Sequence, residues 1–274
     1  MKKLTKDNLL YAITKFRDLK PTYEHWGLTD ILNTESIAHD QFFHIMYNEP
    51  EIRKHCMETA NKVSNRFPLI RLAALYHDTS CYLEKGKMNS KWARNEAIEN
   101  ADQMLRHFEF SEHQRKYVRA LIHVHNYNLL PLKYEQPLRQ WRKAIIDARR
   151  ICPTIGWKDI LRLVMADCDT KKIWKRKWLA RSIIRYFNQQ EILGTIVYSR
   201  HDLDISTDDI FNVCPEIDNR RLTEVYNHLL RHVAFNGYDY NNKPELIMET
   251  VAYIRGKQEK GDILDSRVLY GDRV

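Results

Sequence analysis

The sequence predicts an all-α protein, and three observations lead to this expectation. Apolar residues recur at helical spacing along nearly the whole chain of 274 residues. The chain has only eight glycines, and none are spaced as in GxGxxG or GxxxxGK, so dinucleotide-binding and P-loop sites are not expected. Helix-start signals precede two apolar segments, Pro68 before LIRLAALYHD and Ser111 with Gln114 before residues 112–126.

Helical periodicity places the expected helices in chain order. They are 5–20, 51–66, 68 to 80, 91–108, 112–126, 137–150, 157–187 (one long helix or two abutting ones), 219–234 and 244–257. The polar stretch HDLDISTDDIFNVCPEIDNRRL, residues 201–222, predicts irregular structure. The change of character near residue 190 predicts two regions, a larger one over 1–190 and a smaller helical C-terminal one over 191–274.

Composition limits the cellular setting and the partners. The five cysteines, at positions 56, 81, 152, 168 and 214, form no close pair, which fits reduced thiols in the cytosol. No apolar run has membrane-spanning length, and the N-terminus lacks a signal-peptide core. We therefore expect a cytoplasmic protein without a membrane partner. The net charge of +8 favours nucleic acid or a phosphorylated ligand, although many soluble proteins are mildly basic.

The dipeptide His-Asp is the first candidate for chemistry. It occurs three times, as His39-Asp40, His77-Asp78 and His201-Asp202. An apolar helical run, LIRLAALY, leads into the second copy alone, so we interpret the other two as surface features. The alternative for His77-Asp78 is a helix C-terminus at which the histidine interacts favourably with the helix dipole.

Three expected helices each carry a polar residue on an otherwise apolar face, where burial without a partner is costly. These residues are His55, the pair His77-Asp78, and Asp167 in LRLVMADCD. Imidazole nitrogen and carboxylate oxygen are the ligands of divalent ions in hydrolytic sites. We therefore predict one divalent ion (Mn, Ni, Co, Fe, Zn or Mg) bound by the four side chains. The alternatives are a core histidine at position 55 and a buried salt bridge or cap at position 167.

The order His…His-Asp…Asp resembles that of the HD superfamily of metal-dependent phosphohydrolases, which are helical proteins. A closer likeness, over residues 40–255, is to the HD and tail region of bacterial CCA-adding enzymes (tRNA nucleotidyltransferases). QFFHIMYNEPEIRKHCMETANKV resembles their stretch in which a glutamine and a histidine, here Gln41 and His44, precede the first ligand, here His55. LAALYHDT resembles the doublet, LRLVMADCDTKK the last aspartate segment, and LDISTDDIFNVCPEIDNRRLTEVYNHLL the tail.

This resemblance implies an HD-domain helical bundle with an N-terminal helical extension over 1–190 and a helical tail over 191–274. ADQMLRHFEFSEHQRKYVRALIHVH resembles the following helix pair of the family, with His125 nearest its terminal histidine. Asp78 and His125 are therefore the expected catalytic residues. His44 and His125 either line the pocket and orient phosphate or pack in the core.

The chain departs from the family in three places. Members of the family have HDxGK at the doublet, whereas this chain has HDTSCY, without the glycine and the lysine. The family places a histidine near residue 93, where this chain has KWARNEA, so a second metal ion is not expected. No glycine-led strand with an Asp-x-Asp pair is present, and CCA addition is therefore not expected.

The basic stretch TKKIWKRKWLARSIIR, residues 170–185, begins three residues after Asp167. One interpretation is a phosphate-binding ridge beside the metal, with Lys171, Lys172 and Lys175 as phosphate contacts. The alternative is a solvated helix face whose tryptophans, Trp174 and Trp178, turn to the core at i, i+4 spacing.

These expectations together predict a metal-dependent phosphatase or phosphodiesterase in which Asp78 is a ligand or accepts a proton from the attacking water. The likeness to a tRNA-handling enzyme suggests RNA ends, including 2′,3′-cyclic phosphates, as substrates. The first alternative is a hydrolase of nucleotides or cyclic nucleotides with a closed pocket. The second is a non-catalytic RNA-binding module that retains the fold. The oligomeric state is left open.

Overall fold

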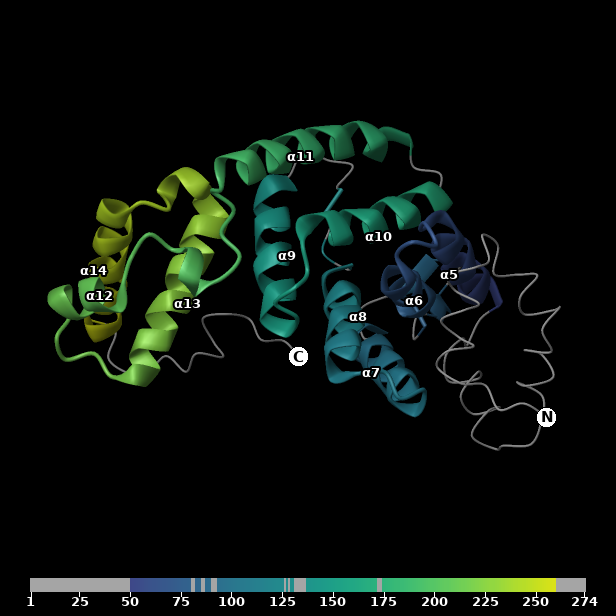
Figure 1. Ribbon diagram of the computed structural model, residues 1–274, viewed down its shortest axis with the longest axis horizontal. Coiled ribbons are helices and arrows are strands. Elements are labelled where there is room, and N and C mark those ends of the chain that lie inside the picture. Colours follow the sequence, from purple (N-terminus) through teal and green to yellow (C-terminus); the bar gives the residue numbers. More distant parts are fainter. Residues whose placement is uncertain are drawn as a thin grey trace. The chain divides into compact units, whose positions relative to one another are not determined.

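The chain folds into helices, as the sequence predicts (Figure 1). The computed structural model describes residues 50–79, 82–84, 87–89, 93–125, 127, 129–130, 137–171 and 174–259. Backbone contacts divide the chain into two units, one ending at Phe187 and the other beginning at Asn188. This division falls inside helix α11 (Trp174–Leu193), and so does the boundary expected at residue 190. None of the described helices is both long and apolar enough to cross a membrane.

The first unit is a helical bundle with one short hairpin. Its helices are α5 (Pro50–Lys62), α6 (Pro68–Tyr76), α7 (Ala93–His107), α8 (Glu112–His125), α9 (Pro137–Ile151), α10 (Trp157–Thr170) and the first part of α11. Between α6 and α7, strand β1 (Tyr82–Glu84) pairs antiparallel with β2 (Lys87–Asn89). The expected helix over 157–187 is thus two helices, and the hairpin is an element that we did not predict.

Helix α6 is the centre of this bundle. Every residue from Ile70 to Tyr76 is buried, as expected for a helix that is apolar on nearly all sides. It packs against α5, α7, α8 and α10. The charged exception is Arg71, whose Nε donates to the carbonyl of Ala60 at 3.1 Å and whose Nη2 donates to Asn61 at 3.3 Å. These bonds join α6 to the end of α5.

The helix-start signals have the predicted geometry. Pro68 lies in the first turn of α6. The backbone N–H of Ser111 donates to the Gln114 side chain at 3.0 Å, and the N–H of Gln114 donates to Ser111 Oγ at 3.3 Å. This reciprocal pair is the capping box that the sequence predicts at the start of α8.

The inner face of α11 packs through Phe187. Its ring stacks on Trp157 with centroids 5.5 Å apart and lies 6.1 Å from Trp141. Both tryptophans are buried, and Trp141 Nε1 donates to the carbonyl of Leu129 at 2.7 Å. These aromatic contacts fix one side of α11 against α9 and α10.

The second unit is also helical. Its elements after α11 are η1 (Arg200–Asp202), α12 (Thr207–Val213), α13 (Asn219–Asn236), η2 (Tyr238–Tyr240) and α14 (Lys243–Glu259). The expectation of irregular structure over 201–222 was wrong for α12. Ser206 and Asp209 form a capping box, with Ser206 Oγ accepting from the N–H of Asp209 at 3.1 Å. Ile210 is the buried residue of this short helix.

Of the other two His-Asp pairs, the structure describes His201-Asp202. His201 and Asp202 are exposed in η1, as the sequence predicts for a surface pair. His39-Asp40 and the helix expected over 5–20 lie outside the described residues.

Candidate metal centre

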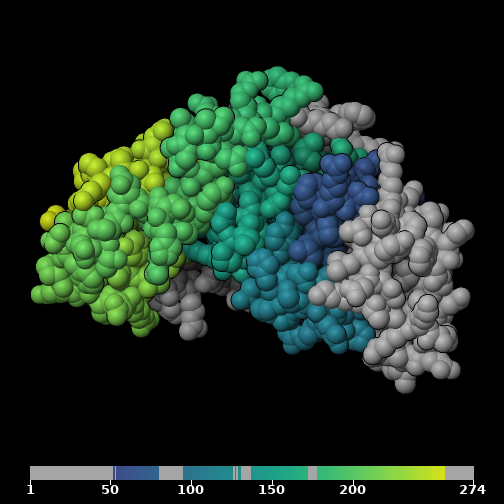
Figure 2. Space-filling view, viewed as in Figure 1, coloured from purple at the N-terminus to yellow at the C-terminus, as the bar shows by residue number. Residues whose placement is uncertain are grey.

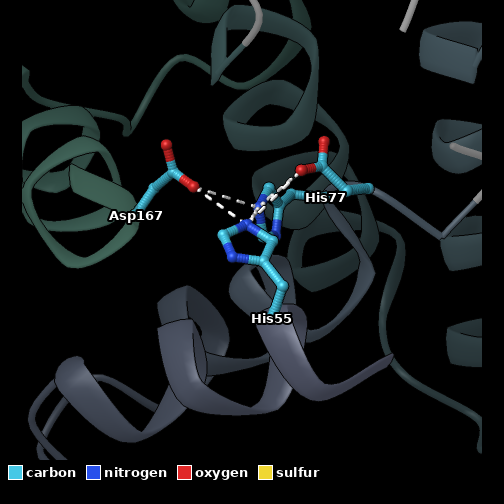
Figure 3. Close-up of side chains that lie close together, drawn as sticks. His55, His77 and Asp167 are labelled. Atoms are coloured by element: carbon cyan, nitrogen blue, oxygen red, sulfur yellow. Dashed lines mark hydrogen bonds and ion pairs between the residues drawn. The ribbon is translucent and has the colours of Figure 1, made fainter. Parts of the chain in front are cut away.

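Three helices bring the four predicted ligands together. His55 lies on α5, His77 and Asp78 directly follow α6, and Asp167 lies on α10. These three helices pack against one another, and the side chains point toward one point between them (Figure 3). Each residue offers one ligand atom, and the four atoms lie within 4.8 Å of one another. Among the described residues, no other group of three such side chains brings its donor atoms this close.

The distances within this cluster fit a divalent ion. His55 Nε2 lies 3.2 Å from His77 Nε2 and 3.0 Å from Asp167 Oδ1. Asp78 Oδ2 lies 3.2 Å from His77 Nε2 and 3.5 Å from His55 Nε2, and Asp167 Oδ1 lies 3.6 Å from His77 Nε2. Ligands about 2.1 Å from a first-row ion lie about 3.0 to 3.5 Å from their neighbours around it. The donor set and its spacing could therefore hold a metal ion.

The end of α6 orients the imidazole of His77. The last four carbonyls of a helix lack a helical donor, and one of them, that of Ala74, accepts a hydrogen bond from His77 Nδ1 at 2.6 Å. Nε2 of the same ring therefore faces the cluster. Such a bond at the far nitrogen is the usual support of a metal-binding histidine. The helix end, which was the alternative interpretation of this pair, supplies the orientation that a ligand needs.

The position of His55 follows from the buried face of α5. Cys56, Thr59 and Ala60 are fully buried on this helix, and the His55 side chain is 13% exposed. Thr59 Oγ1 donates to the carbonyl of His55 at 2.9 Å and lies 3.3 Å from Thr170 Oγ1. We did not single out the two threonines from the sequence, although Thr59 follows His55 by one helical turn.

Charge balance explains the burial of two carboxylates. Burial opposes ionisation of Asp78, but the charge of His77 and hydrogen bonds from both imidazoles hold its pKa well below its usual range. Burial likewise opposes ionisation of Asp167, but hydrogen bonds from His55 and His77 lower its pKa. The two carboxylates therefore require positive charge beside them, which protons on the imidazoles or a metal cation can supply.

The pKa values of the two histidines are raised, opposite to those of the carboxylates. Burial lowers the pKa of His77, but the charge of Asp78 outweighs it, and the pKa is raised well above its ordinary value. Burial also opposes protonation of His55, while hydrogen bonds to Asp167 and Asp78 raise its pKa. Without an ion, the two carboxylates therefore favour protonation of each imidazole, while the charge of His77 opposes protonation of His55.

Lys171 is the predicted phosphate contact that the structure places at the cluster. Its Nζ lies 2.9 Å from Asp167 Oδ1 and 3.0 Å from Asp167 Oδ2, and its side chain is 34% exposed. The salt bridge that we considered for Asp167 is therefore present beside the cluster. The side chains of the other predicted phosphate contacts, His44, Lys172 and Lys175, lie outside the described residues.

His125, at the end of α8, contacts His77 but is not one of the four clustered residues. Its ring meets the ring of His77 edge to face, with centroids 4.4 Å apart and an angle of 82° between the planes. Burial, followed by the charge of His77, lowers the pKa of His125 to about 4. Its Nδ1 is buried without a hydrogen-bond partner among the described residues. This ring is therefore neutral near pH 7 and keeps one nitrogen available.

Comparison with known proteins identified no relative. No family model, curated protein or solved structure matched this chain. The candidate metal centre consequently rests on the geometry of its own side chains, and the likeness to HD phosphohydrolases rests on the sequence segments quoted above.

Proposed function

We propose that this chain is a metal-dependent phosphohydrolase of the HD type that cleaves phosphomonoesters or phosphodiesters. The observation that carries the proposal is the cluster of His55, His77, Asp78 and Asp167, whose donor atoms lie within 4.8 Å of one another. Three separate helices supply these residues, in the chain order of that superfamily. A buried group of two imidazoles and two carboxylates suits a catalytic divalent ion with positions left for water.

Asp78 has the protonation state that this role needs. A divalent ion bound by the four residues supplies water activation and stabilises negative charge on the phosphoryl oxygens. Because the pKa of Asp78 lies well below its usual range, its carboxylate is ionised at neutral pH. It can therefore act as a ligand and accept a hydrogen bond from the attacking water.

Lys171 and His125 supply the contacts to phosphate. The Lys171 ammonium is bonded to Asp167 and partly exposed, so it adds positive charge beside the cluster where a phosphate oxygen arrives. His125 Nδ1 is buried beside His77 without a partner among the described residues. In the neutral tautomer with a proton on Nδ1, this ring donates a hydrogen bond to a phosphoryl oxygen or to the leaving oxygen.

Within the phosphoesters, we propose RNA ends, including 2′,3′-cyclic phosphates, as the substrate class. Support comes from the net charge of +8 and the sequence pI of 9.1, which favour a polyanion over a single nucleotide. The resemblance of the chain to tRNA-handling enzymes points to the same class.

The experiment measures bound metal and hydrolysis on the same purified protein. Wild type, Asp78→Asn and His201→Ala are supplied with manganese, nickel or cobalt and offered p-nitrophenyl phosphate, bis-p-nitrophenyl phosphate and an RNA ending in a 2′,3′-cyclic phosphate. We expect wild type and the exposed-histidine control to bind metal and hydrolyse an ester. Asp78→Asn should keep its helical circular dichroism and lose hydrolysis. A protein that retains no metal and cleaves none of the esters refutes the proposal.

A further inference from the structure

Trp178 is an exposed tryptophan on α11, with 75% of its surface accessible. The alternative considered from the sequence, in which the tryptophans of this stretch turn to the core, is therefore wrong for Trp178. Atoms of α11 are visible on the face of the molecule in Figure 2. A large aromatic side chain held in water is unfavourable, and its indole offers a flat apolar surface on which a ligand can stack.

Helix geometry shows that Trp178 points directly away from the core. The buried side of α11 is formed by Ala180, Ile183 and Phe187, whose exposed fractions are 1%, 1% and 0%. At 100° per residue, Trp178 and Arg185 lie about 160° and 140° around the axis from Ala180. Both side chains therefore project from the side of α11 opposite to its buried side, and a rotamer change cannot bring the indole into this core.

Two arginines share this exposed side. Arg181 and Arg185 follow Trp178 at i+3 and i+7, are exposed, and have no ion pair within the described part of the chain. They lie one helical turn apart, about 6 Å along the axis. We call Trp178, Arg181 and Arg185 together the Trp178 ridge. It combines one flat apolar ring with two cations that no carboxylate of the described residues neutralises.

We propose that the Trp178 ridge binds single-stranded nucleic acid, with an unpaired base stacked on the indole and phosphates bound by the two guanidinium groups. Stacking on an aromatic ring together with basic residues along the strand is the general mode of single-strand binding. Charge complementarity favours this partner, because the two arginines have no ion pair with any described residue and the whole chain carries +8. The inference does not depend on the proposed hydrolysis, because this contact requires no metal.

The test measures binding of a fluorescently labelled, single-stranded RNA of mixed sequence by anisotropy, with EDTA present and over a range of salt. The variants are Trp178→Ala, Trp178→Phe and Arg181→Gln/Arg185→Gln. The controls are Phe235→Ala and Arg220→Gln, which remove an exposed aromatic ring and an exposed guanidinium from the second unit. Circular dichroism checks that each variant is folded.

We expect Trp178→Ala to weaken RNA binding about five- to hundredfold and Trp178→Phe to restore most of the affinity. The slope of log K against log salt is negative, and the double arginine variant should reduce its magnitude by about 1.4, the value for two phosphate contacts on a single strand. The controls should bind like wild type. A duplex RNA should bind more weakly, because its bases are not free to stack.

Three results would each overturn the inference. They are no RNA binding by wild type at low salt, equal binding by wild type and Trp178→Ala, and equal affinity for single-stranded and duplex RNA. The first two would leave a protein with an acidic surface as the partner of this ridge. EDTA separates this test from the proposed function, because EDTA removes the metal that hydrolysis requires and leaves the Trp178 ridge unchanged.

Discussion

Nδ1 of His77 donates a 2.6 Å hydrogen bond to the backbone carbonyl of Ala74, three residues earlier in the chain. This bond uses a carbonyl that the end of α6 leaves without a helical donor. It turns Nε2 of the ring toward His55 Nε2 and Asp78 Oδ2, each of which lies 3.2 Å from His77 Nε2. The end of one apolar helix thus fixes the orientation of the most buried ligand.

Replacing His77 by alanine should remove metal binding and destabilise the metal-free protein. The variant loses the bond to Ala74 and leaves Asp78 and Asp167 buried with one cation fewer, at a cost of about 2 kcal/mol or more. Urea denaturation in EDTA measures the free energy of unfolding, and elemental analysis measures the metal. His201→Ala, at an exposed His-Asp pair, should change stability by about 0.5 kcal/mol or less. Equal losses in the two variants would contradict the assignment.

Replacing Lys171 by methionine should separate substrate binding from metal binding. Lys171 Nζ shares Asp167 Oδ1 with the cluster, at 2.9 Å, so an ion and the ammonium compete for this oxygen. We expect Lys171→Met to bind manganese at least as tightly as wild type, measured by chelator competition, while KM for a phosphoester rises. Asp167→Asn is the matched comparison, because it removes the ligand itself and should lose the metal. Loss of the metal from Lys171→Met would show instead that Lys171 supports the structure of the candidate metal centre.

Most helices of the first unit could be predicted because long apolar periodicity and caps agree along them. The ligands could be predicted for a related reason. His55, His77, Asp78 and Asp167 are polar residues on apolar helical faces, where burial is costly unless the residues meet. Helix packing then determines which of them meet. The order of these residues along the chain, which resembles the order in the HD superfamily, indicated the same combination.

Other features could not be predicted, because tertiary packing or short length determines them. Trp178 follows Trp174 at a core-like i, i+4 spacing, yet Trp178 is exposed, because Phe187 and its contacts with Trp157 and Trp141 define the inner side of α11. Helix α12 is seven residues long with Ile210 as its buried residue, so it shows no apolar period. The strands β1 and β2 have three residues each and are likewise too short for alternation to be visible.

Metal affinity should rise with pH across neutrality. The pKa values of His55 and His77 are raised in the metal-free cluster, chiefly by the carboxylates acting against burial, so an incoming ion must displace protons. Affinity therefore increases until pH exceeds both folded-state pKa values. Calorimetric titration with nickel in buffers of different ionisation enthalpy counts the released protons. Proton release near zero at pH 6.5 would contradict the protonated state of the metal-free cluster.

The same shifts predict how the metal-free protein responds to pH. The raised pKa values of His55 and His77 contribute stability that is complete below 6.5, their ordinary value, and is lost as pH rises through the folded-state values. The lowered pKa values of Asp78 and Asp167 contribute stability that is present above 3.8 and is lost as pH falls. Urea midpoints in EDTA should therefore show a larger contribution from the cluster between pH 3.8 and pH 6.5 than above the folded-state pKa values of the histidines. His77→Gln should reduce that difference, because His55 still titrates.

The second unit should lose stability on acidification through His228 of α13. His228 Nε2 on α13 donates a 2.6 Å hydrogen bond to Glu249 Oε1 on α14, and the ring stacks on Tyr253 with centroids 4.1 Å apart. Burial lowers the pKa of His228, and the opposing bond to Glu249 does not offset it fully. As pH decreases, the His228 imidazole is therefore protonated at a higher pH in the unfolded chain than in the folded chain. The stability of this unit consequently falls as pH decreases below 6.5. Urea midpoints of wild type and His228→Gln, measured between pH 5 and pH 7.5, test this, because the variant should lose part of the pH dependence. Parallel curves for the two proteins would show that another group titrates here.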